Sequence, residues 1–109
     1  MTRSVLGVAW LFAAFAASAQ TFVVPAELWD RPRSGRTILE HPVIRQAVNA
    51  SLAQSGSRLV VHHPAGQESQ LAAEELRSWL TALAIDAKRI SLRGALKPGE
   101  PLRIEVVSD

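Results

Sequence analysis

Residues 58–92 read RLVVHHPAGQESQLAAEELRSWLTALAIDAKRISL, and this stretch decides the fold. It begins at 58–62 with a β-branched run that is typical of a strand buried on at least one face. The Pro-Ala-Gly sequence at 64–66 predicts a turn, and apolar residues then recur at helical spacing over 69–84. Residues 89–92 alternate at period two, which predicts another strand. The stretch therefore predicts a strand, a helix and a strand in that order.

The flanking sequence adds a helix before this unit and a strand on each side. Pro42 suits the first position of a helix, because its missing N–H costs nothing there. Apolar residues after it repeat at one-turn intervals and predict a helix over 42–54. Its buried stripe is expected to consist of Ile44, Ala47, Val48, Ser51 and Leu52. Residues 21–24 predict a short first strand, and residues 102–107 alternate as in a half-buried last strand.

The predicted order is β-α-β-α-β-β, which favours an α/β (α+β) two-layer sandwich with two helices on one face of a small mixed sheet. We expect this core over residues 42–109, preceded by a strand and an irregular loop in residues 20–41. The second helix is expected to bury Ala72, Leu76, Trp79, Leu80 and Leu83. Glu74 and Glu75 are consecutive and so lie about 100 degrees apart on that helix. They are expected on a solvated face and not as an acid–base pair.

Residues 1–19 have the pattern of an export signal. A short segment with one positive charge precedes an apolar run over 5–17, and Ala-Ser-Ala at 17–19 is a small-residue cleavage site. The apolar run is shorter than the roughly 20 residues that span a bilayer. We expect cleavage after Ala19 and a periplasmic or secreted protein that begins at Gln20, without membrane insertion. An uncleaved N-terminal anchor is the alternative.

The composition argues against several functional classes. Loss of Arg3 with the signal lowers Lys plus Arg from 12 to 11, against 10 Asp plus Glu, so the basic pI does not indicate nucleic-acid binding. The absence of cysteine excludes disulfides, a cysteine nucleophile and a lipoprotein anchor. No serine-nucleophile elbow or glycine-rich phosphate loop is found. We therefore expect a protein that is not an enzyme and holds no cofactor.

Three stretches carry a resemblance to a known family: RLVVH at 58–62, LRSWLTALAIDAKRISLRG at 76–94 and LRIEV at 102–106. They are similar to the C-terminal domain of the OmpA-like family. In that family a helix ending in an aromatic-Leu pair leads through a Gly-Ile-x-x-x-Arg-Ile/Leu turn into a strand, and a glycine loop precedes the last strand. The resemblance covers residues 42–107 and implies a peptidoglycan-binding module of the cell envelope.

The residues that would read peptidoglycan are replaced in this chain. The resemblance implies an aspartate after the second strand and an arginine at the start of the second helix, which together grip the zwitterionic end of diaminopimelate. Here Pro64 stands near the aspartate position, and Leu71 or Ala72 takes the arginine position. His62 keeps its place in the motif. We expect an exported envelope-binding or accessory module with weakened or lost peptidoglycan binding.

His62, His63 and Glu68 are the candidate ligand-binding residues, because they surround the turn where the family binds its ligand. Glu68 also has a simpler interpretation as a favourable charge at a helix start. The two histidines are adjacent on a strand and point to opposite faces, so they are not expected to clasp one metal together. A zinc site that adds His41, in a metal-dependent hydrolase, is the least favoured alternative.

Trp29, Arg31 and Arg33 form the second candidate group and lie in the Pro- and Gly-containing loop. They predict a contact with a protein partner, because tryptophan and arginine often dominate the binding energy of interfaces. The alternative function is therefore a periplasmic protein–protein interaction module that uses residues 28–36. A solvated charged loop, with Trp29 in the core, is the simpler interpretation.

Overall fold

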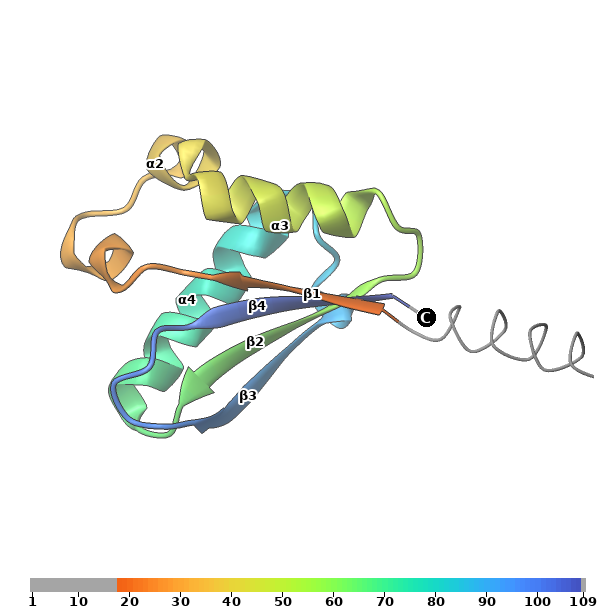
Figure 1. Ribbon diagram of the computed structural model, residues 1–109. Coiled ribbons are helices and arrows are strands. Elements are labelled where there is room, and N and C mark those ends of the chain that lie inside the picture. Colours follow the sequence, from red (N-terminus) through yellow and green to blue (C-terminus); the bar gives the residue numbers. More distant parts are fainter. Residues whose placement is uncertain (1–17, 109) are drawn as a thin grey trace, which may run out of the picture.

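The computed structural model describes residues 18–108, which form a sheet layer and a helix layer (Figure 1). The long elements are β1 (Ser18–Val23), α3 (Pro42–Leu52), β2 (Arg58–Pro64), α4 (Gln67–Ala82), β3 (Ile90–Leu96) and β4 (Arg103–Ser108). The short elements are the 3-10 helices η1 (Ala26–Asp30) and η2 (Ala87–Arg89) and the helix α2 (Gly35–Glu40). The predicted α+β fold class is confirmed.

The sheet is mixed, with the strand order β1-β4-β2-β3. β4 pairs antiparallel with β1 on one side and with β2 on the other. β2 and β3 are parallel, and α4 provides the crossover that parallel neighbours need. Within the described residues, β3 therefore forms one edge of the sheet and β1 forms the other.

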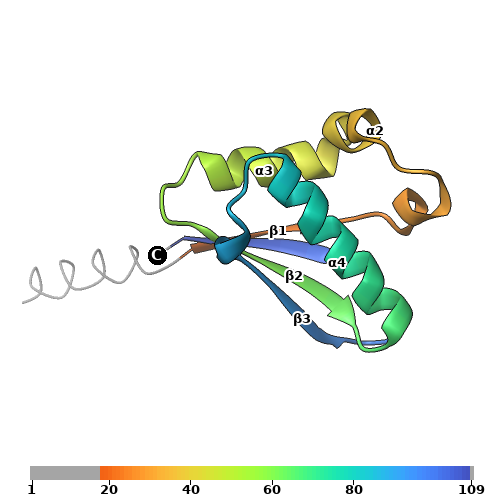
Figure 2. The same cartoon turned by 180° about the vertical axis from the view of Figure 1, so that it is seen from behind.

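Both long helices cover the same face of the sheet. α3 packs on β1 and β4, and α4 packs on β2 and β3. The strands pass in front of α4 in Figure 1, whereas α4 lies in front of the strands in Figure 2. The other face of the sheet is not covered by any helix in residues 18–108. We call this second surface the open face.

The core lies between the sheet and the helices. Leu102, Ile104 and Val106 are buried, as the alternation near the C-terminus predicts. Leu59 and Val61 of β2 lie opposite Val106 and Ile104 and are fully buried with them. Apolar residues of both helices complete the core: Ile44, Ala47, Val48, Ala73, Leu76 and Leu80.

Residues 25–36 are more ordered than the sequence predicts. They contain η1 and the start of α2, in place of an irregular loop. Ser34 caps α2 by accepting a hydrogen bond from the Thr37 N–H at 3.2 Å. Leu28 and Ile38 anchor the segment in the core. Such short helices bury single residues and so leave no hydrophobic repeat to detect.

Several predicted boundaries differ from the structure. β1 begins at Ser18 and not at residue 21, and α3 ends at Leu52, whose side chain is 59% exposed instead of buried. α4 begins at Gln67 and buries Ala73, while Ala72 is half-buried. Leu52 is the last residue of α3, and its side chain lines a surface pocket instead of joining the core.

The predicted export signal falls largely on residues 1–17, which lie outside the described residues. The predicted cleavage point lies within β1, between Ala19 and Gln20. Cleavage there would leave residues 20–23 of the strand, including the Gln20–Val106 and Phe22–Ile104 pairs with β4. None of the helices in residues 18–108 has both the length and the apolar character needed to cross a membrane.

Candidate functional site

Residues 28–36, which we call the Trp29 loop, are tied to α4 by an internal ion pair between Arg33 and Glu75. Arg33 donates from Nε to Glu75 Oε2 and from Nη2 to Glu75 Oε1, the second bond measuring 3.0 Å. Its Nη1 also donates to the carbonyl oxygens of Trp29 and Arg31, at 3.2 and 2.8 Å. The guanidinium carbon lies 5.2 Å from the centroid of the Trp29 ring, within cation–π range. Arg33 is therefore occupied inside the molecule.

Glu75 is half-buried and bonded to Arg33 instead of lying on a fully solvated face, which corrects the sequence prediction for this residue. Its Oε2 also accepts a hydrogen bond from Trp79 Nε1 at 3.0 Å. Hydrogen bonding to Arg33 lowers the pKa of Glu75, and the same bond raises the pKa of Arg33. The arrangement fixes a loop on a helix, and it has no free acid or base for proton transfer.

A mostly apolar depression of about 260 Å³ lies beside this loop and includes Leu28, Arg31 and Pro32 in its lining. Trp29 is half-buried and packs against the core, whereas Arg31 is exposed. Two buried nitrogen atoms in this region, Trp29 Nε1 and His41 Nδ1, have no hydrogen-bond partner. Among the three predicted partner-binding residues, Trp29, Arg31 and Arg33, it is therefore Arg31 whose side chain is available to a partner.

His62, His63 and Glu68 do not converge on one site. His62 Nε2 lies 2.9 Å from Glu105 Oε1 on the open face, and the imidazole donates because a carboxylate only accepts. His63 is buried, and its Nδ1 donates to the Pro64 carbonyl at 2.7 Å. Glu68 is exposed in the first turn of α4. Residues 18–108 contain no group of three or more His, Cys, Asp or Glu able to hold a metal ion.

His63 has a packing role at the end of β2. A Cβ atom built on Gly94 would lie 2.9 Å from His63 Cε1, closer than real Cβ contacts allow. The glycine in β3 therefore makes room for the imidazole ring. His63 holds the end of β2 against β3 and is not accessible to a ligand.

The positions at which the resemblance implies an aspartate and an arginine carry apolar residues in the structure. Pro64 is buried in β2 and pairs with Leu96 of β3. Leu71 is 58% exposed near the start of α4. Residues 65–66 alone connect β2 to α4, and they carry no ionisable side chain. The two residues of the turn themselves therefore supply neither the anion nor the cation that a zwitterionic ligand requires.

Charged residues are instead concentrated on the open face. Strand register places Arg93, His62 and Arg103 in one row across β3, β2 and β4. Val60 and Glu105 lie in the next row, so Glu105 sits beside His62 and reaches it. No hydrogen bond or ion pair engages the side chains of Arg93 or Arg103 within residues 18–108. These two guanidinium groups are available to an external anion.

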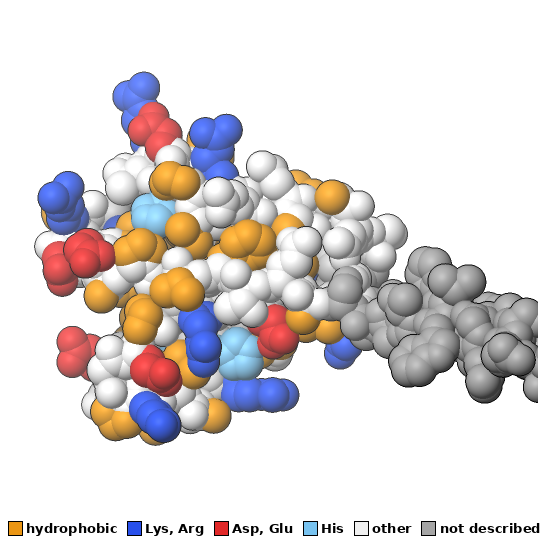
Figure 3. Space-filling view, viewed as in Figure 1, with side chains coloured by type: hydrophobic (Ala, Val, Ile, Leu, Met, Phe, Trp, Pro, Cys, Tyr) orange, Lys and Arg blue, Asp and Glu red, His pale blue; other side chains and the backbone are white. Residues whose placement is uncertain are grey.

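A groove of about 370 Å³ lies on this face. Four of its lining residues are basic: Arg58, Lys88, Arg89 and Arg93. Val60 and Val107 contribute apolar surface, and Glu105 is the acidic lining residue. Figure 3 shows basic side chains (blue) beside a histidine (pale blue) and acidic groups (red) over the strands. The groove is therefore positively charged although the net charge of the whole chain is small, at +2.

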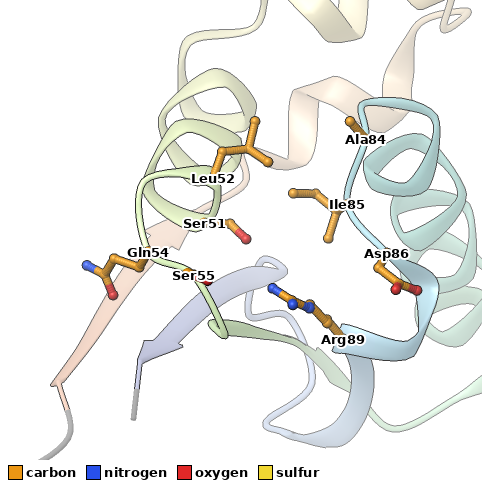
Figure 4. Close-up of a pocket in the computed structure, with 8 residues that line it drawn as sticks. All are labelled: Ser51, Leu52, Gln54, Ser55, Ala84, Ile85, Asp86 and Arg89. Carbon is orange, nitrogen blue, oxygen red and sulfur yellow. The ribbon is translucent and has the colours of Figure 1, made fainter.

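A second pocket, of about 190 Å³, adjoins the groove at Arg89 (Figure 4). Arg89 points into it toward the end of α3, and Asp86 points away. Ser51 and Ser55 supply hydroxyl groups on the opposite side. The carbonyl end of a helix carries partial negative charge, which favours a cation and disfavours an anionic ligand. Arg89 therefore lines both this pocket and the groove, and the pocket itself is not assigned an anionic ligand.

The groove was not predicted from the sequence, although the sequence indicates part of the charged face that forms it. The alternation in 58–62 and in 102–107 assigns Arg58, His62 and Arg103 to one face of their strands. It does not reveal that β4 lies beside β2, which is what brings Arg103 and Glu105 to His62. Strand order was therefore the missing information.

Comparison with protein-family models, with curated proteins and with solved structures finds no match to this chain.

Proposed function

We propose that this chain is an exported, non-enzymatic module of OmpA-like type that binds a component of the cell envelope through the open face of its sheet. The observation that carries the proposal is the positively charged groove, in which Arg93 has no internal partner. The export pattern of residues 1–19 supports the cellular location. An ordered β-α-β-α-β-β core, with β2 between two helices in chain order, supports the OmpA-like type.

Weakened or lost peptidoglycan binding is part of this proposal. Recognition of a zwitterionic amino acid end requires one anion and one forked cation. The turn after β2 presents neither, since Pro64 is buried and Leu71 is apolar. The binding function is therefore assigned to a different surface from the one that the resemblance implies.

Cosedimentation of the purified protein with isolated cell envelopes, over a series of salt concentrations, tests the proposal. Protein-free peptidoglycan sacculi are used in parallel, to separate the cell wall from envelope proteins. We expect saturable binding to envelopes that weakens with salt, because the contacts are charged and exposed. Binding to sacculi is expected to be at least about tenfold weaker, a difference of about 1.4 kcal/mol.

A pair of matched charge reversals locates the binding surface. The variant Arg93→Glu/Arg103→Glu changes the open face, and the control Arg45→Glu/Arg77→Glu changes exposed residues of α3 and α4 equally in charge. The proposal predicts that the first variant loses envelope binding and the control retains it. Equal binding by both variants, or tight binding to bare sacculi by all forms, would refute it.

A protein–protein interaction module that uses residues 28–36 is the second candidate. It is favoured by the apolar depression beside the loop and by the unpartnered Trp29 Nε1 and His41 Nδ1. Trp29 packs on the core, so Arg31→Ala is a cleaner test than Trp29→Ala. This candidate predicts that Arg31→Ala abolishes crosslinking to an envelope protein while Arg93→Glu does not. The opposite pattern would exclude it.

A further inference from the structure

We propose that the β3 edge of the sheet binds an acidic, extended peptide segment, which adds as a strand beside β3 with its carboxylates over the open face. This inference rests on the proposed function and names the chemistry of the partner for the same face. The proposed partner is a protein segment in which acidic and apolar residues alternate.

The first support is the position of β3 in the sheet. β3 pairs with β2 and with no other strand in residues 18–108, so one side of its backbone is available. Figures 1 and 2 both show it at the margin of the molecule. Its seven residues contain no proline, and Ser91, Arg93 and Ala95 are exposed. A strand of this length suffices to pair with an added peptide strand.

The second support is the distribution of charge beside this edge. Lys88 and Arg89 directly precede β3, and Arg93 lies within it, on the side of the groove. The acidic residue of the groove, Glu105, is two strands away and is bonded to His62. An anion that approaches β3 therefore meets cations first. A ligand with several carboxylates suits this surface better than a neutral one.

The third support is the alternation of side chains between the two faces of the sheet, which an added peptide strand would share with β3. Side chains of an added strand alternate between the two faces of the sheet. If its acidic residues lie over Arg93, the residues between them lie on the helix-covered side, next to Leu92, which pairs with the buried Val61. Leu92 is half-buried at this edge and precedes the register shift between β2 and β3. Apolar residues at the alternate positions of the peptide would cover it, which specifies the alternating pattern.

Fluorescence anisotropy with a labelled peptide of alternating Glu and Val, of about eight residues, tests the inference. The full chain is used, with an otherwise identical peptide of Gln and Val as the neutral control. We expect the acidic peptide to bind and the neutral peptide to bind at least tenfold more weakly. Arg93→Glu is expected to weaken binding about tenfold, and Arg77→Glu on α4 is expected to leave it unchanged.

Two N-methylated peptides distinguish strand addition from charge attraction alone. In an extended strand the N–H groups of alternate residues point to opposite sides. Methylation of all Glu nitrogens or of all Val nitrogens therefore blocks different edges, and one of the two peptides should lose binding while the other keeps it. Equal binding by both peptides, or indifference to Arg93→Glu, would overturn the inference.

The result of the peptide-binding experiment can be distinguished from the result of the envelope experiment. Salt-sensitive envelope binding without binding of the acidic peptide would overturn this inference and leave the proposed function in place. Binding of the peptide in the predicted manner, without any envelope binding, would refute the proposed function and leave the edge assignment standing.

Discussion

Glu75 illustrates how a single residue can hold a loop that has few other anchors. It accepts hydrogen bonds from Arg33 and from Trp79, which joins the Trp29 loop to α4. The two residues of the ion pair are 42 positions apart, so no local pattern in the sequence predicts their contact. The pattern shows two adjacent glutamates, of which Glu74 is exposed and Glu75 is half-buried. The two glutamates differ in exposure because the folded chain brings Arg33 to Glu75 and not to Glu74.

Glu75→Gln is expected to lower the free energy of unfolding at pH 7 by about 0.5–1 kcal/mol, since the pair is partly exposed. The carboxylate has a lowered pKa in the folded state because Arg33 donates to it. Its stabilisation is therefore present above the ordinary Glu pKa of about 4.3 and is lost as the pH falls through the lower, folded value. Urea unfolding at pH 7 and at about pH 3 measures the difference.

The control for this prediction is Glu74→Gln, which makes the same chemical change on the neighbouring exposed residue. We expect it to change stability by less than about 0.5 kcal/mol at either pH. An equal effect of the two substitutions, or a Glu75→Gln effect that persists undiminished at low pH, would contradict the role assigned to the ion pair.

Gly94→Ala is expected to destabilise the protein by about 1–3 kcal/mol, because the added methyl group meets the buried His63 ring. Gly35→Ala is the matched control, since a Cβ at Gly35 meets nothing within 4 Å. Thermal unfolding of both variants, and of Gly94→Ala in a His63→Ala background, checks the explanation. If Gly94→Ala costs as much without the histidine as with it, the steric account is wrong.

At the scale of elements, periodic segments were predictable and short ones were not. The residues of α3 and α4 repeat with the helical period, and those of β2 and β4 alternate, because each element buries one face on the same core. η1 and α2 each bury a single residue, Leu28 and Ile38. Their positions depend on contacts with distant elements, which sequence periodicity does not report.

The end of α4 leads to a prediction about stability. Ala84 follows the helix with a φ of 83°, a left-handed conformation that glycine adopts without steric cost. Ala84→Gly is expected to raise the free energy of unfolding by about 0.5–1 kcal/mol. Ala82→Gly, at the last helical residue, is expected to lower it by a similar amount. Circular dichroism melting of the two variants would contradict this account if Ala84→Gly were the more damaging.

At the scale of the whole molecule, the fold class followed from the sequence and the candidate site did not. Element order and alternation sufficed for a two-layer α+β structure. The open face depends on strand order, which brings Arg103 of β4 and Arg93 of β3 to either side of His62. Residues chosen from the sequence, such as Arg33 and His63, are instead occupied by internal contacts.

Amide hydrogen exchange of the protein, free and bound to isolated envelopes, tests the central claim that the open face and its β3 edge form the binding surface. The account predicts that bound protein exchanges more slowly in Ile90–Leu96, while residues 25–36 and the first turn of α4 are unchanged. Slower exchange in residues 25–36 would assign binding to the Trp29 loop. Slower exchange confined to residues 62–70 would assign it to the turn that binds peptidoglycan in the OmpA-like family, and either result would contradict the account.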